Sequence, residues 1–219
     1  VRSMDAATDF SPEQRRYLEG LVAGMSAARA TPALTPAPAQ PVGPDAPHLI
    51  AMARTESEGR KLVDQEKFKR DEHPLDAYVR LKGEAEAGNY PKPPDNYRWR
   101  WYGLFYVAPN QNSFMCRLRM PNGILNHWQL SGLALLSETH GGGYAHVTTR
   151  ANLQIREIEA AKAPSLIEAI WDLGLATRGA GADNVRNVTG SPTAGIDPQE
   201  LIDTRTYARH WHFHVLNTR

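Results

Sequence analysis

The sequence has almost no cysteine, since Cys116 is the only one among 219 residues. A single thiol excludes internal disulfides and any metal site built from cysteines alone. The chain also lacks an apolar run long enough to cross a bilayer, and its first residues do not form a signal peptide. Its net charge is +1, so no overall basic field favours nucleic acid or an acidic membrane. We therefore predict a cytoplasmic protein that has neither a nucleic-acid partner nor a membrane partner.

Arginines and amides stand at alternate positions beside apolar residues in two stretches. Arg117 and Arg119 flank Leu118, and residues 152–156 alternate amides and an arginine with leucine and isoleucine. In an extended chain, alternate side chains share one face. Each stretch therefore predicts an apolar underside and a polar upper face. Guanidinium groups fork onto carboxylates and oxyanions, so this face predicts a ligand with several negative charges.

Apolar periodicity and turn residues predict the order of helices and strands. We expect helices at about 12–28, 49–69, 74–88, 125–139, 164–174 and 207–216, and strands at 104–107, 114–120, 144–148 and 153–158. Pro91, Pro93 and Pro94 are interpreted as the end of a helical arm, with β structure beginning at Trp99. The order strand, helix, strand, strand, helix is typical of a ferredoxin-like α+β sandwich.

Three blocks, in this order and spacing, carry a resemblance to a known family: residues 114–121, 148–157 and 182–190. They resemble the N-terminal half of the sirohaem-dependent nitrite and sulfite reductases, of the assimilatory ferredoxin–nitrite reductase type. Further matching residues lie at 10–14, 93–100, 121–123, 194–197 and 203–205.

The resemblance and the composition together predict five segments. These are an N-terminal helix at 1–30, a linker rich in proline and alanine at 31–47, a helical arm at 48–98, a ferredoxin-like half-domain at 99–190, and the truncated start of a sirohaem and 4Fe–4S domain at 191–219. We expect the chain to be incomplete and inactive by itself, as a truncated chain or a gene fragment.

The resemblance implies a parent enzyme that performs the six-electron reduction of nitrite to ammonia or of sulfite to sulfide. It implies sirohaem and a 4Fe–4S cluster as cofactors, and reduced ferredoxin or a similar protein as electron donor. The cluster cysteines of the family lie in the C-terminal half and are absent from this chain. The residues present do not distinguish nitrite from sulfite, and they do not give the oligomeric state.

The resemblance also assigns roles to residues. Arg117 and Arg186 match arginines that contact the substrate anion, and we predict them as catalytic. We predict that the carboxylates of sirohaem bind Arg117, Arg119, Thr148, Thr149, Arg150, Asn152, Gln154, Arg156, Asn184 and Asn187. No metal ligand is predicted.

Plainer interpretations stand beside these roles. The arginines could form a solvated sheet face, the asparagines could order a turn, and His210, His212 and His214 are taken as packing or surface residues. Alternative functions are a non-catalytic fragment and a ferredoxin-like module that binds single-stranded nucleic acid. Under the family interpretation, Arg117, Arg119, Gln154 and Arg156 should lie on an uncovered face, opposite the helices near 125–138 and 164–174.

Overall fold

The computed structural model describes residues 11–30, 40–108 and 112–218. The chain divides into two compact units, Val1–Ile50 and Ala51–Arg219. Within the described residues, no helix has the length and apolar character needed to cross a membrane. Most of the predicted linker at 31–47, and residues 109–111 between the first two predicted strands, lie outside the described residues.

The first unit contains helix α1 (Pro12–Ala30), as the sequence predicted. Ser11 caps it, because its Oγ accepts a hydrogen bond from the backbone N of Gln14 at 3.2 Å. The Gln14 side chain accepts one from the N of Ser11 at 2.9 Å in return. This reciprocal capping box satisfies backbone groups that the helix leaves without partners.

The helical arm is more broken than the sequence predicted. It contains α2 (Ala46–Ser57), α3 (Asp64–Asp71), the 3₁₀ turn η1 (Pro74–Asp76), α4 (Tyr78–Glu86) and α5 (Pro93–Trp101). The interpretation that Pro93 and Pro94 end the arm was wrong, since they begin α5. Proline is accepted in the first turn of a helix because its missing N–H has no intrahelical acceptor there. Helix α5 therefore runs past Trp99, where β structure was expected.

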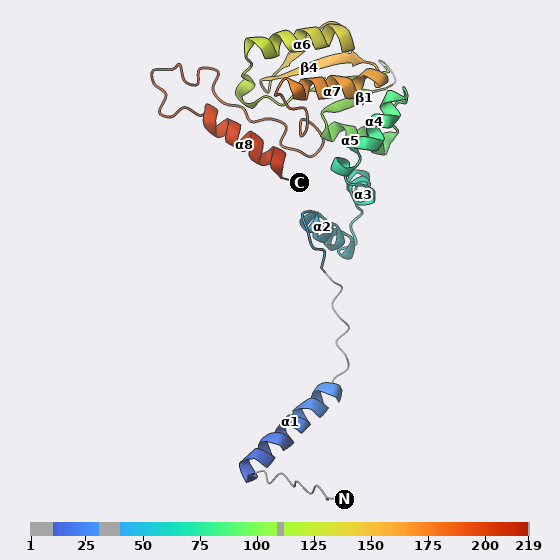
Figure 1. The fold of residues 1–219 in the computed structure, drawn as a ribbon, viewed down its shortest axis with the longest axis vertical. Coiled ribbons are helices and arrows are strands. Elements are labelled where there is room, and N and C mark those ends of the chain that lie inside the picture. Colours follow the sequence, from blue (N-terminus) through green and yellow to red (C-terminus); the bar gives the residue numbers. More distant parts are fainter. Residues whose placement is uncertain (1–10, 31–39, 109–111, 219) are drawn as a thin grey trace, which may run out of the picture. The chain divides into compact units, whose positions relative to one another are not determined.

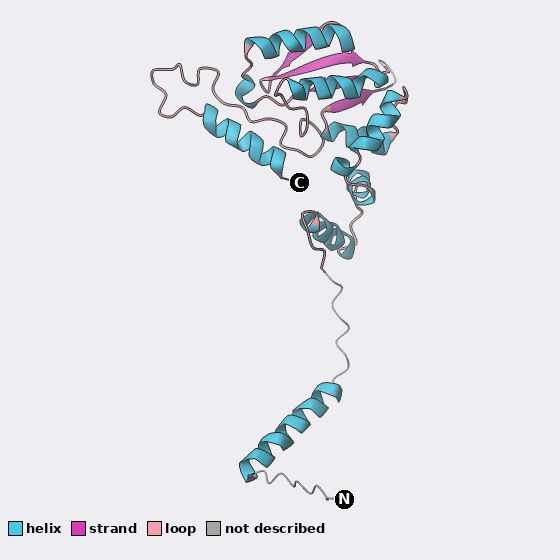
Figure 2. Ribbon diagram, viewed as in Figure 1, coloured by secondary structure: helices cyan, strands magenta, loops and turns pink. Residues whose placement is uncertain are grey.

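A four-stranded antiparallel sheet forms the centre of the second unit (Figures 1 and 2). Its strands are β1 (Leu104–Val107), β2 (Ser113–Arg117), β3 (Ala145–Thr148) and β4 (Asn152–Ile158), in the order β1-β2-β4-β3. Helix α6 (His127–His140) connects β2 to β3, which are separated in the sheet by β4. Helix α7 (Ala163–Asp172) follows β4 after the short turn η3 (Ala160–Lys162). This split βαβ arrangement confirms the predicted ferredoxin-like α+β fold.

The sheet buries one face against α6 and α7, in line with the alternation in the sequence. Phe114, Cys116 and Leu118 are at most 1% exposed, and they share the core with residues of α7. A bulge in β4 adds one residue, because Phe114 pairs with Ile158 while Cys116 pairs with Ile155. The extra residue lets both isoleucines face the core, which strict alternation would not allow.

The last part of the chain follows α7 as a long connection and then helix α8 (Arg205–Asn217). The connection pairs with the sheet region at one isolated bridge, between Arg119 and Ala176. Helix α8 packs against the short turn η2 (Pro121–Gly123) that follows β2. The predicted helix near 207–216 is thus present.

Candidate functional site

Three strands bring polar side chains together on the sheet face opposite α6 and α7. Arg117 of β2 is the partner of Gln154 in β4, and Gln154 is also the partner of His146 in β3. Thr148 and Asn152 form the next pair on the same face. Directly opposed residues on neighbouring strands have their side chains on the same side of a sheet, so the predicted residues of two distant blocks lie side by side.

Four arginines gather at this face, and we call them the arginine cluster: Arg117, Arg150, Arg156 and Arg186. Burial lowers the pKa of Arg117, and the nearby positive charges of Arg186, Arg150 and Arg156 lower it further. A hollow of about 40 Å³ lies among three of these arginines, and Thr148, Asn152 and Gln154 complete its lining.

The arginine cluster has no carboxylate partner among the described residues. The ion pairs of the structure involve other arginines and lysines, such as Arg80 with Glu72 and Asp95. Arg156 donates to the side-chain oxygen of Gln154 at 3.3 Å, and its buried Nε has no acceptor in the part of the chain that the structure describes. Repulsion among guanidinium groups is relieved by an anion with several charges.

Arg117 is held in place by neutral groups. Its guanidinium carbon lies 4.6 Å from the centre of the Phe105 ring, and its Nη1 donates to the carbonyl of Ala180 at 3.4 Å. A cation over an aromatic face is stabilised without losing its charge. Arg117 is therefore oriented before any ligand arrives.

The segment that carries Arg186 is tied to the helical arm and to the sheet. Asp183 accepts hydrogen bonds from the Tyr97 hydroxyl at 2.8 Å and from Lys69 Nζ at 2.9 Å. Asn187 Nδ2 donates to the carbonyl of Arg150 at 2.9 Å. Asn184 Nδ2 donates to the carbonyl of Gly181 at 2.8 Å, which is the turn-ordering use of asparagine.

Arg119 does not lie on an uncovered face, so that part of the sequence interpretation was wrong. The residue is 1% exposed. Its Nη1 donates to the carbonyls of Gly179 and Val185, and its Nε donates to Nδ1 of His212 in α8 at 3.1 Å. The connection after α7 and helix α8 thus enclose a side chain that alternation alone placed beside Arg117.

The other predicted residues divide by exposure. Asn152 and Gln154 are buried, so the expectation that Gln154 lies uncovered was wrong as well; Thr148 is half-buried, and Thr149, Arg150 and Arg186 are exposed. His212 is buried while His210 and His214 are exposed, as expected for packing and surface residues. Sequence reasoning missed Phe105, His146, Tyr97 and Lys69. His146 can be recognised as a neighbour of Gln154 only when the register between β3 and β4 is known.

The donor set agrees with one implied cofactor and not with the other. Arginines and amides with unused donors suit a macrocycle that carries several carboxylates. Cys116 is 0% exposed, and burial raises the pKa of its thiol, so it does not suit a cluster-binding thiolate. Among the described residues, no group of three or more histidine, cysteine, aspartate or glutamate side chains could hold a metal ion.

Residues 106–171 match the model of the nitrite/sulfite reductase ferredoxin-like half domain. The ferredoxin–nitrite reductase of Leptolyngbya laminosa is 43% identical over 62% of this chain and 26% of its own length. The chloroplastic ferredoxin–nitrite reductase of Oryza sativa is 42% identical over 57% of this chain and 21% of its own length.

A solved structure supports the same relationship. The structure of Mycobacterium tuberculosis NirA protein superposes with a TM-score of 0.63 at 26% identity, over 71% of this chain and 32% of that one. The chain therefore spans about a fifth to a third of the length of these three proteins. The resemblance to nitrite and sulfite reductases is confirmed over that part.

Proposed function

We propose that this chain is the N-terminal portion of a sirohaem-dependent nitrite reductase and supplies half of its cofactor and anion site. The observation that carries the proposal is the arginine cluster, with four guanidiniums on one sheet face and no carboxylate partner among the described residues. The names of the relatives support nitrite as substrate and ferredoxin as donor. Their greater length supports a longer parent protein, in which other segments supply the thiolates of a 4Fe–4S cluster.

The residues divide into two groups by position. Arg150 and Arg156 flank the buried amides of β4, and with Thr148 and Thr149 they would hold the peripheral carboxylates of sirohaem. Arg117 and Arg186 would face the substrate anion, where fixed positive charge stabilises negative charge that develops as oxygen departs. Sirohaem would supply the iron centre and the path for electrons.

The asparagines of the Arg186 segment have an indirect role in this proposal. The side-chain amides of Asn184 and Asn187 donate hydrogen bonds to the carbonyls of Gly181 and Arg150, respectively. They would therefore orient Arg186 and Arg150 toward the macrocycle. Arg119 is left out of the cofactor-binding set, because protein groups enclose its guanidinium.

A binding titration of the purified chain tests the proposal without turnover. Uroporphyrin, a porphyrin with eight carboxylates, should bind saturably, and its octamethyl ester should not. Binding would be followed by porphyrin absorbance and by quenching of tryptophan fluorescence. The double change Arg150→Gln and Arg156→Gln should weaken binding at least tenfold.

A matched control is Arg54→Gln, which removes an exposed arginine of α2 that pairs with Glu58. This variant should bind uroporphyrin as the unchanged chain does. If the ester binds as well as the acid, or if the double variant binds normally, the proposal fails. Salt-sensitive binding of single-stranded RNA through the same arginines, without porphyrin binding, would instead favour the nucleic-acid alternative.

A further inference from the structure

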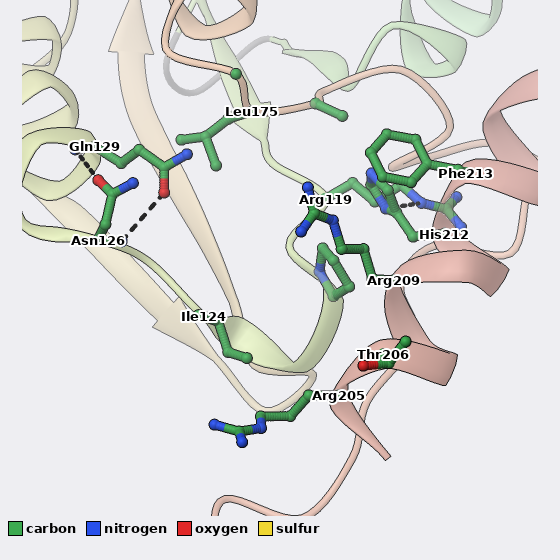
Figure 3. Close-up of a pocket in the computed structure, with 13 residues that line it drawn as sticks. Arg119, Ile124, Asn126, Gln129, Leu175, Arg205, Thr206, Arg209, His212 and Phe213 are labelled. Carbon is green, nitrogen blue, oxygen red and sulfur yellow. Dashed lines mark hydrogen bonds between the residues drawn. The ribbon is translucent and has the colours of Figure 1, made fainter. Parts of the chain in front are cut away.

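A second cationic site lies away from the arginine cluster, in a pocket of about 400 Å³ beside helix α8. One wall comes from α8, with Arg205, Thr206 and Arg209. The opposite wall runs from η2 to the start of α6 and includes Ile124 (Figure 3). None of the described residues that line this pocket is acidic. We call it the α8 pocket.

Arg119 is a buried residue that lines the α8 pocket, and part of its guanidinium has no acceptor among the described residues. A guanidinium has five N–H groups. The Nε of Arg119 donates to His212, and Nη1 donates to two backbone carbonyls. Nη2 is buried and has no hydrogen-bond partner among the described residues. Two N–H groups of a nearly fully buried side chain therefore have no acceptor, in a residue that lines the pocket.

Among the described residues, none supplies a negative charge to Arg119. Every acceptor it contacts is neutral, since two are carbonyls and the third is His212, whose pKa is lowered to about 4. Burial and then the charge of Arg119 cause that lowering. A buried guanidinium without a counter-ion is costly, and one bound anion would remove most of that cost.

Further positive groups converge on the same cavity. Arg209 lies at the pocket wall with its guanidinium carbon 5.9 Å from the Phe213 ring, and it has no carboxylate partner in the described part of the chain. The first backbone N–H of α8, that of Arg205, already donates to the carboxylate of Asp203 at 3.0 Å, and the Arg205 guanidinium pairs with the same carboxylate at 2.6 Å. Arg209 is therefore the cation of α8 that can meet an anion in this pocket.

The walls limit what kind of anion fits. Ile124, Leu175 and Phe213 add apolar surface, and a cavity of about 400 Å³ exceeds what one inorganic ion fills. We propose that the α8 pocket binds a small organic molecule through its phosphate, sulfate or carboxylate group, which pairs with the guanidinium of Arg209 in the pocket that Arg119 helps to line. This site is separate from the arginine cluster and does not depend on the proposed reductase function.

Calorimetric titration of the 219-residue chain tests the proposal with three ligands: phenyl phosphate, phenyl sulfate and benzoate. At least one should bind with a stoichiometry of one, and the comparison identifies the preferred anionic group. Benzyl alcohol, which lacks the charge, should not bind. Arg209→Gln and Arg119→Met should each weaken binding of the preferred ligand at least tenfold.

Two controls distinguish binding in the α8 pocket from binding at the arginine cluster and from loss of the fold. Arg150→Gln removes a cation of the arginine cluster and should leave the affinity unchanged. Thermal unfolding of Arg119→Met shows whether that variant is folded, and Arg209→Gln provides the decisive result if it is not. The proposal is wrong if none of the three ligands binds saturably, or if Arg150→Gln abolishes binding while Arg209→Gln does not.

Discussion

The hydrogen bond between Arg119 and His212 constrains the protonation of the imidazole. Nδ1 of His212 accepts from Nε of Arg119 at 3.1 Å, so that nitrogen carries no proton in the folded chain. Protonation would place a second donor and a second positive charge against a buried guanidinium. Burial and the charge of Arg119 accordingly lower the pKa of His212 from its usual 6.5 to about 4.

This pKa predicts how stability changes with pH. Between pH 6.5 and about 4 the unfolded chain binds a proton at His212 that the folded chain does not. Stability contributed by the neutral imidazole should therefore be complete above pH 6.5 and fall as the pH drops toward 4. Urea unfolding of the chain at several pH values measures the loss.

A variant separates the contribution of His212 to the pH dependence of stability from that of carboxylates that titrate in the same pH range. His212→Asn keeps an acceptor near the position of Nδ1 but does not titrate, so the loss of stability on acidification should be smaller than in the unchanged chain. His210→Asn, which removes an exposed imidazole from the same helix, should leave the pH dependence as it was. Equal pH dependence in all three proteins would contradict the role of His212.

The sequence predicted the face of the strand on which each side chain lies better than it predicted the elements that cover that side chain. Alternation placed Arg117 and Arg119 on one face, away from Cys116 and Leu118, and both of the latter are buried as expected. The sequence could not show that α8 covers Arg119, because His212 lies 93 residues further along the chain. Pairs so distant leave no periodic signal.

At the scale of elements, the junction between α5 and β1 depends on a glycine. Gly103 has φ +82°, and a Cβ there would lie 2.5 Å from the carbonyl oxygen of Arg117 and 2.6 Å from that of Thr177. The carbonyl of Gly103 also accepts a hydrogen bond from the N of Arg117 at 2.7 Å. The turn thus sets the position of the strand that carries Arg117.

Two alanine substitutions separate backbone conformation from close packing. Gly88 has φ +81° and open space where a Cβ would be, so Gly88→Ala should cost only the conformational penalty of about 1 kcal/mol. Gly103→Ala adds a clash with two backbone atoms, and we expect it to cost about 1–3 kcal/mol more. The free energy of unfolding in urea measures both changes. Similar losses in the free energy of unfolding for the two variants would show that β2 can move away from the added Cβ without a further cost.

The elements also show where turn residues mislead. Apolar periodicity predicted α6 and α7 to within two residues, because each packs an apolar stripe on the sheet. Prolines are ambiguous, since they are excluded from helix interiors but accepted in the first turn. The sequence between Gly88 and Trp101 was therefore compatible both with the end of the helical arm and with the start of a new helix. Packing of Tyr97 and Trp99 in the core favours the helix.

At the scale of the whole molecule, the candidate site assembles from three separate segments. Arg117 comes from β2, Arg150 and Arg156 flank the residues that pair β3 with β4, and Arg186 comes from the connection before α8. The family resemblance predicted all four, and the electrostatic effect of three of them on Arg117 places them near one another. The bonds from Lys69 and Tyr97 to Asp183 were not predictable, because nothing local marks a partner in another element.

Substitutions in the longer enzyme that we propose would separate the two groups of arginines. Arg117→Ala or Arg186→Ala removes a fixed cation from the place where negative charge develops, so nitrite turnover should fall about a hundredfold or more. Sirohaem content should fall much less, because under the proposed function Arg150 and Arg156 would still bind its carboxylates. The double change Arg150→Ala and Arg156→Ala should do the reverse and yield protein depleted in sirohaem. Absorbance of the purified enzyme measures the content, and a reduced-dye assay normalised to sirohaem measures the turnover. The division of roles is wrong if both sets of variants lose sirohaem but keep an unchanged turnover per sirohaem, since all four arginines would then serve only to hold the macrocycle.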